Sequence, residues 1–400
     1  MHFSYKRPME TNNNLPFKDS ESKSIFWSSS FELKEFFLYV DMSEISLLPP
    51  ADFHCHLRQS EMSDLVTPLV SEGGVETCLV MPNTQPPITT TDMAVEYRNK
   101  LQSLAKNVQF VMTLYLSPSL TPEEIRKAAA NGITDTGVKS YPRGVTTNSD
   151  GGIESYEVYY PVFEAMEQEN MVLNLHGEVP SSEETGVTVL NAEERFLPQL
   201  DKLARSFPKL RIVVEHATTK AAVEKVKSLP DNVGCSITPH HLQLIVDDWA
   251  GQGFNFCKPV AKYWEDRNAL RDVIREGHPR FFLGSDSAPH PRANKLNKAP
   301  RFIAETQESV PACACAAGLF TSAILIPLCA HLLESFGALD KLEGFVSKNG
   351  RAFYQIQPKA DSKPVKLVKE DNVVPIEYTK GDNIVVPFMA GNKISWKIVN

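Results

Sequence analysis

A short apolar run that ends in polar residues, ADFHCHLR at positions 51–58, decides how the rest of the chain is interpreted. The period of two in an extended segment points His54, His56 and Arg58 to one face and the intervening residues to the other. The same pattern, a buried strand followed by polar side chains, returns along the chain. We therefore interpret residues 51–57 as the first of a set of parallel strands.

From this strand onward, short β-branched or apolar runs alternate with longer amphipathic segments, which is typical of repeated strand-helix units. Eight strands are expected, at residues 51–57, 77–82, 109–116, 137–141, 172–176, 211–216, 234–238 and 280–284. Helices are expected between them, at residues 91–104, 121–131, 156–169, 192–206 and 221–228. This alternation predicts an α/β fold, a closed (β/α)8 TIM barrel rather than an open sheet.

The two ends of the chain differ from this regular middle part. The first forty or so residues are rich in Asn, Ser, Lys and Glu without a clean period, so we expect residues 1–45 to be a disordered N-terminal extension and everything before Met42 to be dispensable. We assign residues 46–355 to the barrel and residues 356–400 to a C-terminal segment packed on it. A helical region is expected at 313–336, followed by strand-like pieces without the strand alternation of a β-sandwich.

The composition excludes several classes of protein. With 42% hydrophobic and 22% charged residues, the 400-residue chain can bury a sizeable core, and a single barrel occupies ~250 residues or more. A net charge of −8 without a Lys/Arg-rich run argues against a nucleic-acid partner. No apolar run reaches the roughly 18 residues of a membrane span. Seven cysteines, an odd number without a secretory leader, argue against disulfides and favour the cytoplasm.

Several predicted strands end in residues that bind metals, and in a barrel the carboxyl ends of the strands form the active site. These residues are His54, His56, His176, His216 and Asp286, with Lys139 placed among them, while His290 follows Asp286 after the last strand. A single histidine at a strand end is more often a hydrogen-bonded core residue than a ligand. The combination of several histidines with an aspartate favours a metal site over a set of core residues, because imidazole and carboxylate groups are ordinary zinc ligands. The sequence therefore predicts a metal site at this end of the barrel.

Lys139 needs a separate explanation, because an ammonium group beside bound cations would be repelled. Addition of CO₂ turns the amine into a carbamate, whose two oxygens could bridge two metals ~3.5 to 4 Å apart. The alternative is an unmodified Lys139 that binds a substrate anion.

Together these motifs resemble a known family. In chain order they read HCHLR, MPNT, GVKSYP, LHGE, EHATTK and GSDSAPH. They are similar to the dihydroorotase family of the short, barrel-only type, within the metal-dependent amidohydrolase superfamily. The resemblance implies one zinc ion on His54, His56 and Asp286, a second on His176 and His216, and carbamylated Lys139 and a hydroxide bridging the two.

The same resemblance implies how a substrate is held. The contacts would come from Arg58, Asn83 and His290 on a carboxylate, Thr146 and Thr147 in a mobile loop, and Lys258 beside the ring. Arg58 also shares the metal-facing side of the first strand and offers a fork that suits a planar carboxylate. Alternatively, Asn83 could serve a turn after Pro82, and residues 145–152 could be an ordinary flexible loop.

The activity implied by the resemblance is reversible hydrolysis of a cyclic amide, the interconversion of L-dihydroorotate and N-carbamoyl-L-aspartate in pyrimidine (UMP) biosynthesis. Asp286 would be both a metal ligand and the carrier of a proton to the leaving nitrogen. We expect a cytoplasmic homodimer whose partner is a small-molecule substrate.

Two alternatives remain. A hydantoinase or allantoinase would share the metal site, but those enzymes usually wrap the barrel with a sandwich built from both termini, and Arg58 and Asn83 favour an acidic substrate. A non-catalytic scaffold related to such enzymes typically loses metal ligands, and none is missing from this sequence.

Overall fold

The structure is a computed structural model that describes residues 43–132, 137–149, 151–296 and 315–399. The chain divides into two units, Met1–Asp41 and Met42–Asn400, and every described residue belongs to the second. The expected disordered extension therefore lies, except for its last residues, outside the described residues. Within the described ranges, no helix is both long and apolar enough to cross a membrane.

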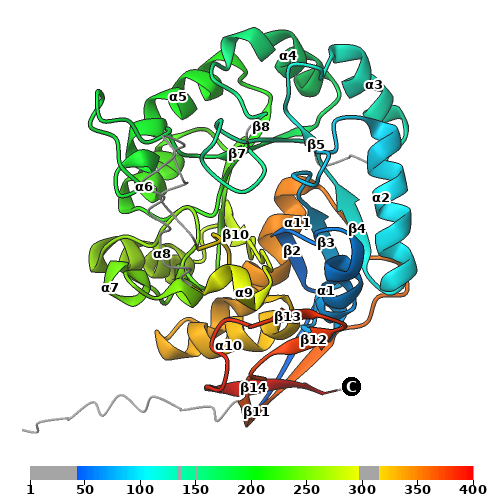
Figure 1. Cartoon of the computed structure of the whole chain (residues 1–400), viewed down its shortest axis with the longest axis vertical. Coiled ribbons are helices and arrows are strands. Elements are labelled where there is room, and N and C mark those ends of the chain that lie inside the picture. Colours follow the sequence, from blue (N-terminus) through cyan, green and yellow to red (C-terminus); the bar gives the residue numbers. More distant parts are fainter. Residues whose placement is uncertain (1–42, 133–136, 150, 297–314, 400) are drawn as a thin grey trace, which may run out of the picture. The chain divides into compact units, whose positions relative to one another are not determined.

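The second unit is built on a ring of parallel strands (Figure 1). They are β2 (Ala51–Cys55), β3 (Thr77–Val80), β4 (Gln109–Met112), β5 (Leu114–Tyr115), β6 (Val138–Ser140), β7 (Val172–His176), β8 (Arg211–Glu215), β9 (Val233–Ile237) and β10 (Phe281–Leu283). From β2 to β4 and from β5 to β10, each strand pairs with the strand that follows it in the sequence. Only Thr113 separates β4 from β5, so they act as one strand. The predicted eight-strand α/β barrel is confirmed.

Backbone hydrogen bonds between the first and last strands close the ring. His56 N donates to Ser287 O, and Asp286 N donates to His54 O, each at 2.9 Å. Cys55 and Ser287 form a parallel bridge between these hydrogen bonds. Closure leaves no free edge in the barrel, and it joins two segments that are more than 200 residues apart in sequence.

The buried Asp52 side chain reinforces this closure. It accepts hydrogen bonds from Ser285 N at 2.8 Å, Ser285 Oγ at 2.5 Å and His54 N at 3.1 Å. Burial raises the pKa of Asp52 to about 7, although the hydrogen bonds from Ser285 favour its charged form.

Helices surround the strands (Figure 1). They are α1 (Ser60–Glu72), α2 (Thr91–Leu104), α3 (Pro122–Ala130), α4 (Tyr160–Gln168), α5 (Ala192–Ser206), α6 (Lys220–Ser228), α7 (Val246–Trp249), α8 (Trp264–Glu276), α9 (Arg292–Lys295), α10 (Leu325–Ser335) and α11 (Asn349–Tyr354). The five predicted helices correspond to α2–α6. Thr90, Thr121 and Thr219 cap the N-termini of α2, α3 and α6, each accepting a hydrogen bond from a backbone N–H three residues on.

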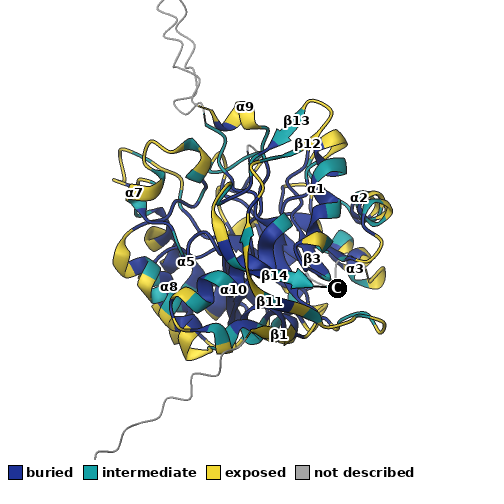
Figure 2. Cartoon of the chain, turned by 90° about the horizontal axis from the view of Figure 1, so that it is seen from below, coloured by how far each residue is buried: buried dark blue, intermediate teal, exposed yellow. Residues whose placement is uncertain are grey.

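The strands are largely buried (Figure 2), and buried apolar side chains form a core of two layers. The larger layer lies between strands and helices, and the smaller one fills the barrel with residues that include Phe53, Val213, Phe282 and Tyr354. The rings of Phe53 and Tyr354 stack at 4.7 Å, which brings α11 against the inner strand residues. A Cβ on Gly350 of α11 would lie 2.3 Å from the Phe53 ring, so this close approach requires glycine.

Both ends of the second unit contribute to an additional sheet. β1 (Glu44–Leu47), β11 (Val365–Val373) and β14 (Lys393–Val399) form an antiparallel sheet in the order β1-β11-β14. A hairpin of β12 (Tyr378–Lys380) and β13 (Asn383–Val385) lies between β11 and β14 in sequence. The expectation that the tail lacks strand alternation is wrong: Ile394 and Trp396 alternate as buried residues in β14, a pattern too short to recognise in the sequence.

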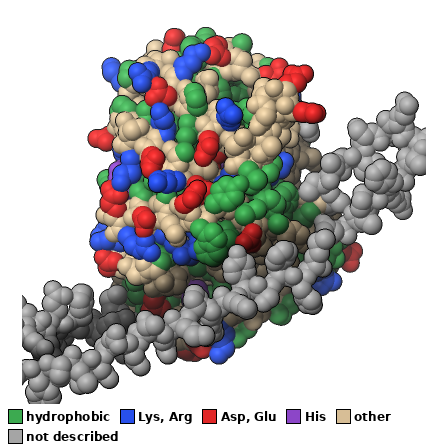
Figure 3. Space-filling view, turned by 90° about the vertical axis from the view of Figure 1, so that its left-hand side faces the viewer, with side chains coloured by type: hydrophobic (Ala, Val, Ile, Leu, Met, Phe, Trp, Pro, Cys, Tyr) green, Lys and Arg blue, Asp and Glu red, His purple; other side chains and the backbone are tan. Residues whose placement is uncertain are grey.

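Figure 3 shows one face of the protein, on which Lys/Arg and Asp/Glu side chains are interspersed and hydrophobic side chains gather in one area. The described residues visible on this face form no continuous basic surface of the kind that binds a phosphate backbone.

The terminal sheet is expected to be part of the cooperative fold, because Trp396 is fully buried and its Nε1 donates to Glu334 Oε2 on α10 at 3.1 Å. Replacing Trp396 with Ala removes this packing and should lower the free energy of unfolding by about 3 to 5 kcal/mol, measured by chemical denaturation. The control is Trp264→Ala, at a side chain that is 59% exposed and stacks on Arg267, with an expected loss of about 1 kcal/mol or less. Equal losses in the two variants would show that the sheet is not part of the stable fold.

Candidate active site

Buried polar side chains meet at the carboxyl ends of β2 and β10. Asp286 Oδ1 lies 3.1 Å from His56 Nε2 and 3.5 Å from His54 Nε2. The three side chains can each offer one ligand atom, and these atoms all lie within 4.8 Å of one another. Barrel closure therefore brings together two histidines and an aspartate that lie more than 200 residues apart in sequence.

The hydrogen bonds of His56 show which nitrogen is available as a ligand. Its Nδ1 lies 2.7 Å from Asn83 Oδ1, and because an amide oxygen can only accept, Nδ1 carries the proton. In a neutral ring Nε2 then presents a lone pair to the Asp286 carboxylate. Two lone pairs at 3.1 Å repel unless a proton or a cation lies between them. Burial lowers the pKa of His56, which favours a cation over a proton at this position.

Three further predicted ligands lie beside this group. The ring of His216, after β8, is 4.9 Å from the ring of His54 and 4.7 Å from the ring of His176 at the end of β7. Lys139 of β6 is fully buried, and no described residue hydrogen-bonds to its Nζ or to His216 Nδ1. Burial lowers the pKa of Lys139 to about 8, although the charges of Glu215 and Asp286 oppose this. The structure thus brings all six predicted ligands together.

Two buried carboxylates that the sequence analysis did not assign hold the histidines in place. Glu178 Oε2 accepts from His176 Nε2 at 2.8 Å, which leaves His176 Nδ1 as the free ligand atom. Glu215 Oε2 lies 2.9 Å from His54 Nδ1 and accepts from Ser236 Oγ. Burial raises the pKa of Glu215 to about 7. Such carboxylates fix ring orientation in metal sites. In the sequence, Glu178 follows the strand-end His176 by two residues and Glu215 directly precedes His216, so both were visible as acidic residues near a strand end.

The chemistry of these residues fits a bound metal cofactor. Imidazole and carboxylate are ordinary zinc ligands, and buried nitrogens without hydrogen-bond partners, such as Lys139 Nζ and His216 Nδ1, are unfavourable unless a ligand satisfies them. Burial lowers the pKa of His54 and His216 well below the usual value, so both rings are neutral and able to ligate.

Arg58 and His290 lie side by side next to the candidate ligands. A guanidinium nitrogen of Arg58 is 3.1 Å from His290 Nε2, and Arg58 Nε donates to Pro289 O at 2.9 Å. His290 Nε2 also lies 2.9 Å from Ala317 O. Burial, followed by the charge of Arg58, lowers the pKa of His290 to about 3, so this ring is neutral. The two side chains form a cationic, hydrogen-bonding wall that can receive a carboxylate.

Asn83 connects the histidines to the loop that carries Thr146 and Thr147. While its Oδ1 faces His56, its Nδ2 donates to Thr147 O at 3.0 Å. Asn148 Nδ2 donates back to Asn83 O at 2.9 Å. Both threonines are partly exposed in this loop. Asn83 therefore does more than form the turn after Pro82.

Lys258 contacts the same loop from the other side of the site, where its Nζ donates to Val145 O at 2.9 Å. The region around Thr321 and Ser322, whose role was left open, uses both backbone N–H groups to donate to Ser287 Oγ, at 3.0 and 3.1 Å. These two N–H groups support the strand end and do not face a substrate.

Three residues of the site have left-handed backbone conformations. Arg58 has a φ of 55°, His216 of 43° and Asp286 of 45°, at the ends of β2, β8 and β10. This region is unfavourable for residues other than glycine, and such strain concentrates at functional sites. The turns bend the side chains of these residues into the mouth of the barrel instead of continuing the strand.

Comparison with known proteins identifies relatives along nearly the full chain. None of the protein-family models compared with the chain matches it. The chain is 56% identical over 394 residues to a dihydroorotase of Mycosarcoma maydis, a match that covers 90% of this chain and 100% of that protein. It is 43% identical to a dihydroorotase of Saccharomyces cerevisiae, covering 89% of this chain and 98% of the relative.

Solved structures of similar proteins also include a dihydroorotase. The crystal structure of dihydroorotase from Saccharomyces cerevisiae in complex with 5-fluoroorotic acid superposes with a TM-score of 0.81 at 41% identity, covering 89% of this chain and 98% of that one. An L-hydantoinase of Arthrobacter aurescens superposes with a TM-score of 0.72 at 18% identity, covering 89% of this chain and 83% of that one. The second similarity concerns the fold alone.

The loop contacts predict a measurable effect. Asn148 has a φ of 55° and hydrogen-bonds to Asn83 O and Gln85 Nε2, so Asn148→Ala loses both bonds and leaves an alanine in a strained conformation. Limited proteolysis should cut residues 143–149 several-fold faster than in the wild type. Asn170→Ala is the matched control, since Asn170 has a φ of 54° but donates to Gln355, away from this loop. Unchanged cleavage in Asn148→Ala would mean that these contacts do not hold the loop.

Proposed function

The chain belongs to the dihydroorotase family, and from this premise we propose that it interconverts N-carbamoyl-L-aspartate with L-dihydroorotate and water in de novo pyrimidine biosynthesis. It is an enzyme that acts on cyclic amide C–N bonds. The observation that carries the substrate assignment is the position of Arg58, Asn83 and His290 next to His56 and the ligand cluster. A carboxylate bound there would hold the ring amide beside the ligand cluster.

The proposed cofactor is a pair of zinc ions. His54, His56 and Asp286 would hold one, His176 and His216 the other, and carbamylated Lys139 and a hydroxide would bridge them. When bound, the two ions would polarise the ring carbonyl and make a water molecule acidic enough to attack at neutral pH. The neutral imidazoles and the unpartnered, buried Nζ of Lys139 support this assignment.

The protein's own residues position the substrate and move the proton. Arg58 and His290 bind the substrate carboxylate, and the Nδ2 of Asn83 turns from Thr147 O to the same group. The Asp286 carboxylate takes a proton from the attacking water and delivers it to the ring nitrogen as the C–N bond breaks. The loop with Thr146 and Thr147, held by Asn148 Nδ2 on Asn83 O and by Lys258 on Val145 O, closes the site against bulk water.

The alternatives are now weighed differently. A sheet built from both termini is present, so the argument against a hydantoinase from a missing sandwich no longer applies. Arg58 and Asn83 still favour an acidic substrate, and the identity to dihydroorotases is much higher than that to hydantoinases of known structure. A non-catalytic scaffold is disfavoured because all six proposed ligands are present and converge.

We also propose a cytoplasmic homodimer. Five of the cysteines among the described residues, Cys55, Cys78, Cys235, Cys257 and Cys329, are free thiols, which suits a reducing compartment. The dimer follows from the family resemblance alone, and light scattering on the purified protein measures it.

The experiment that tests the function is a spectrophotometric assay of the metal-replete enzyme with dihydroorotate, hydantoin and allantoin. We expect turnover of dihydroorotate at least about 100-fold faster than of either other ring, because only dihydroorotate carries a carboxylate for Arg58. Turnover of hydantoin or allantoin alone would overturn the substrate assignment and leave the metal site standing.

Replacing Arg58 with Met tests the carboxylate contact directly. Loss of a charge-assisted hydrogen bond of about 1.5 to 3 kcal/mol should lower kcat/KM for dihydroorotate by about 10- to 100-fold, with metal content unchanged. The control is Arg292→Met, because Arg292 follows His290 closely in sequence but pairs with Glu377 on the surface. Equal activity of Arg58→Met and the wild type would refute the role of Arg58.

A further inference from the structure

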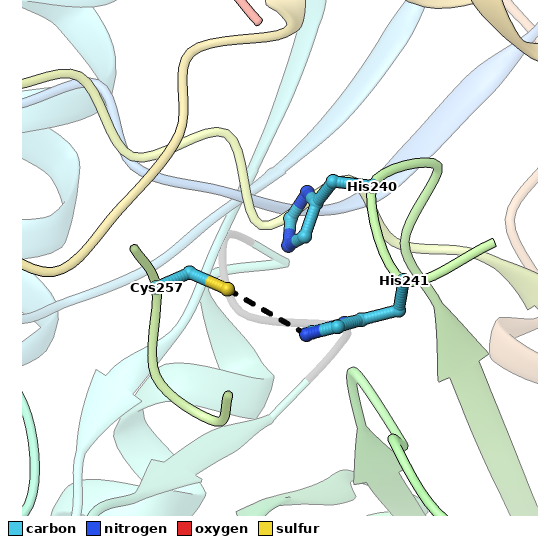
Figure 4. Close-up of side chains that lie close together, drawn as sticks. All are labelled: His240, His241 and Cys257. Atoms are coloured by element: carbon cyan, nitrogen blue, oxygen red, sulfur yellow. Dashed lines mark hydrogen bonds between the residues drawn. The ribbon is translucent and has the colours of Figure 1, made fainter. Parts of the chain in front are cut away.

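A second cluster of potential metal ligands lies outside the proposed two-metal site. His240 and His241 follow β9, and Cys257 lies in the segment that leads to α8 (Figure 4). All three side chains are buried, and one ligand atom from each lies within 4.8 Å of the others. None of the three has a part in the reaction proposed above.

His240 gives an independent reason to look for a ligand here. Its side chain has no exposed surface, and neither Nδ1 nor Nε2 has a hydrogen-bond partner among the described residues. Its ring lies 4.5 Å from the ring of His241, and Figure 4 shows it facing the space between His241 and Cys257. A buried imidazole with both nitrogens unsatisfied is unfavourable, so something that binds a nitrogen lone pair is missing from its surroundings.

His241 and Cys257 already have a separation that suits coordination. The distance from Cys257 Sγ to His241 Nε2 is 3.6 Å. Two ligands at ordinary Zn–N and Zn–S bond lengths and a tetrahedral angle are also about 3.6 Å apart. Pro259 O lies 3.0 Å from His241 Nε2 and 3.3 Å from Cys257 Sγ, within reach as a fourth, oxygen ligand.

We propose that His240, His241 and Cys257 form a further binding site for a thiophilic transition-metal ion such as Zn²⁺. Two imidazoles and one thiolate select soft or borderline cations over Mg²⁺ or Ca²⁺. The ion would tie the turn after β9 to the segment that carries Lys258, whose Nζ contacts the active-site loop at Val145 O.

The protons balance within the site. Cys257 binds as the thiolate and releases its proton to solvent. His241 binds through Nε2, and its ring proton moves to Nδ1, where Thr238 Oγ1 accepts it at 2.8 Å. His240 binds through one nitrogen without breaking any hydrogen bond of its ring. No change of oxidation state is involved.

Cobalt added to the purified holoenzyme gives a selective test. A thiolate bound to Co²⁺ has a near-ultraviolet charge-transfer band, and the proposed two-metal site has no sulfur ligand, so exchange of its ions is silent at this wavelength. We expect the band in the wild type, with one more equivalent of bound metal than in Cys257→Ser. The result does not depend on turnover of dihydroorotate, so it can fail independently of the proposed function.

Three variants decide the assignment. Cys257→Ser and His240→Asn should each reduce the band by at least about tenfold, while Cys315→Ser, a half-buried cysteine outside the cluster, should retain it. If His240→Asn does not fold, the near-isosteric Cys257→Ser carries the test alone. A wild type without the band, or a band that survives in Cys257→Ser, overturns the proposal.

Discussion

The backbone pairing between β2 and β10 is the constraint on which the site depends. Two 2.9 Å hydrogen bonds pair the end of β2 with the segment that follows β10 and place His54 beside Asp286, although the two residues are far apart in sequence. The same pairing aligns His56 with Ser287, whose hydroxyl supports the backbone at Thr321 and Ser322. Because the ring closes here, small shifts of β10 relative to β2 would separate the carboxylate from both imidazoles at once.

Burial sets the protonation states of the ionisable side chains at the mouth of the barrel. The pKa values of His54 and His216 are lowered and that of Glu215 is raised, each mainly because burial disfavours the charged form. The histidines are thereby kept as neutral ligands, and the carboxylates Glu178 and Glu215 orient them. A cation in their midst would satisfy groups that are otherwise unfavourably buried.

The proposed substrate contacts come from loops that follow the barrel strands and not from the strands themselves. Asn83 follows β3, the threonine loop follows β6, and Lys258 lies beyond β9, yet their hydrogen bonds converge on residues 145–148. The loop contacts are few and partly exposed, whereas the ligand cluster is rigidly enclosed. This difference suits the proposed function, in which enclosed side chains would hold metal ions and a loop would close over the substrate.

By itself, the sequence determined the strand–helix alternation, the eight strands, and the six candidate ligands, because period-two burial and strand-end polarity are local patterns. Only the tertiary structure decided that Glu178 and Glu215 orient the ligands, that Asn83 links His56 to the loop, and that His240, His241 and Cys257 meet. The tertiary structure also pairs β1 with β11 and β11 with β14. Local periodicity cannot predict such pairing between segments that are far apart in sequence. Contacts of this kind depend on which segments the closed barrel brings together, and that information lies in packing between distant residues.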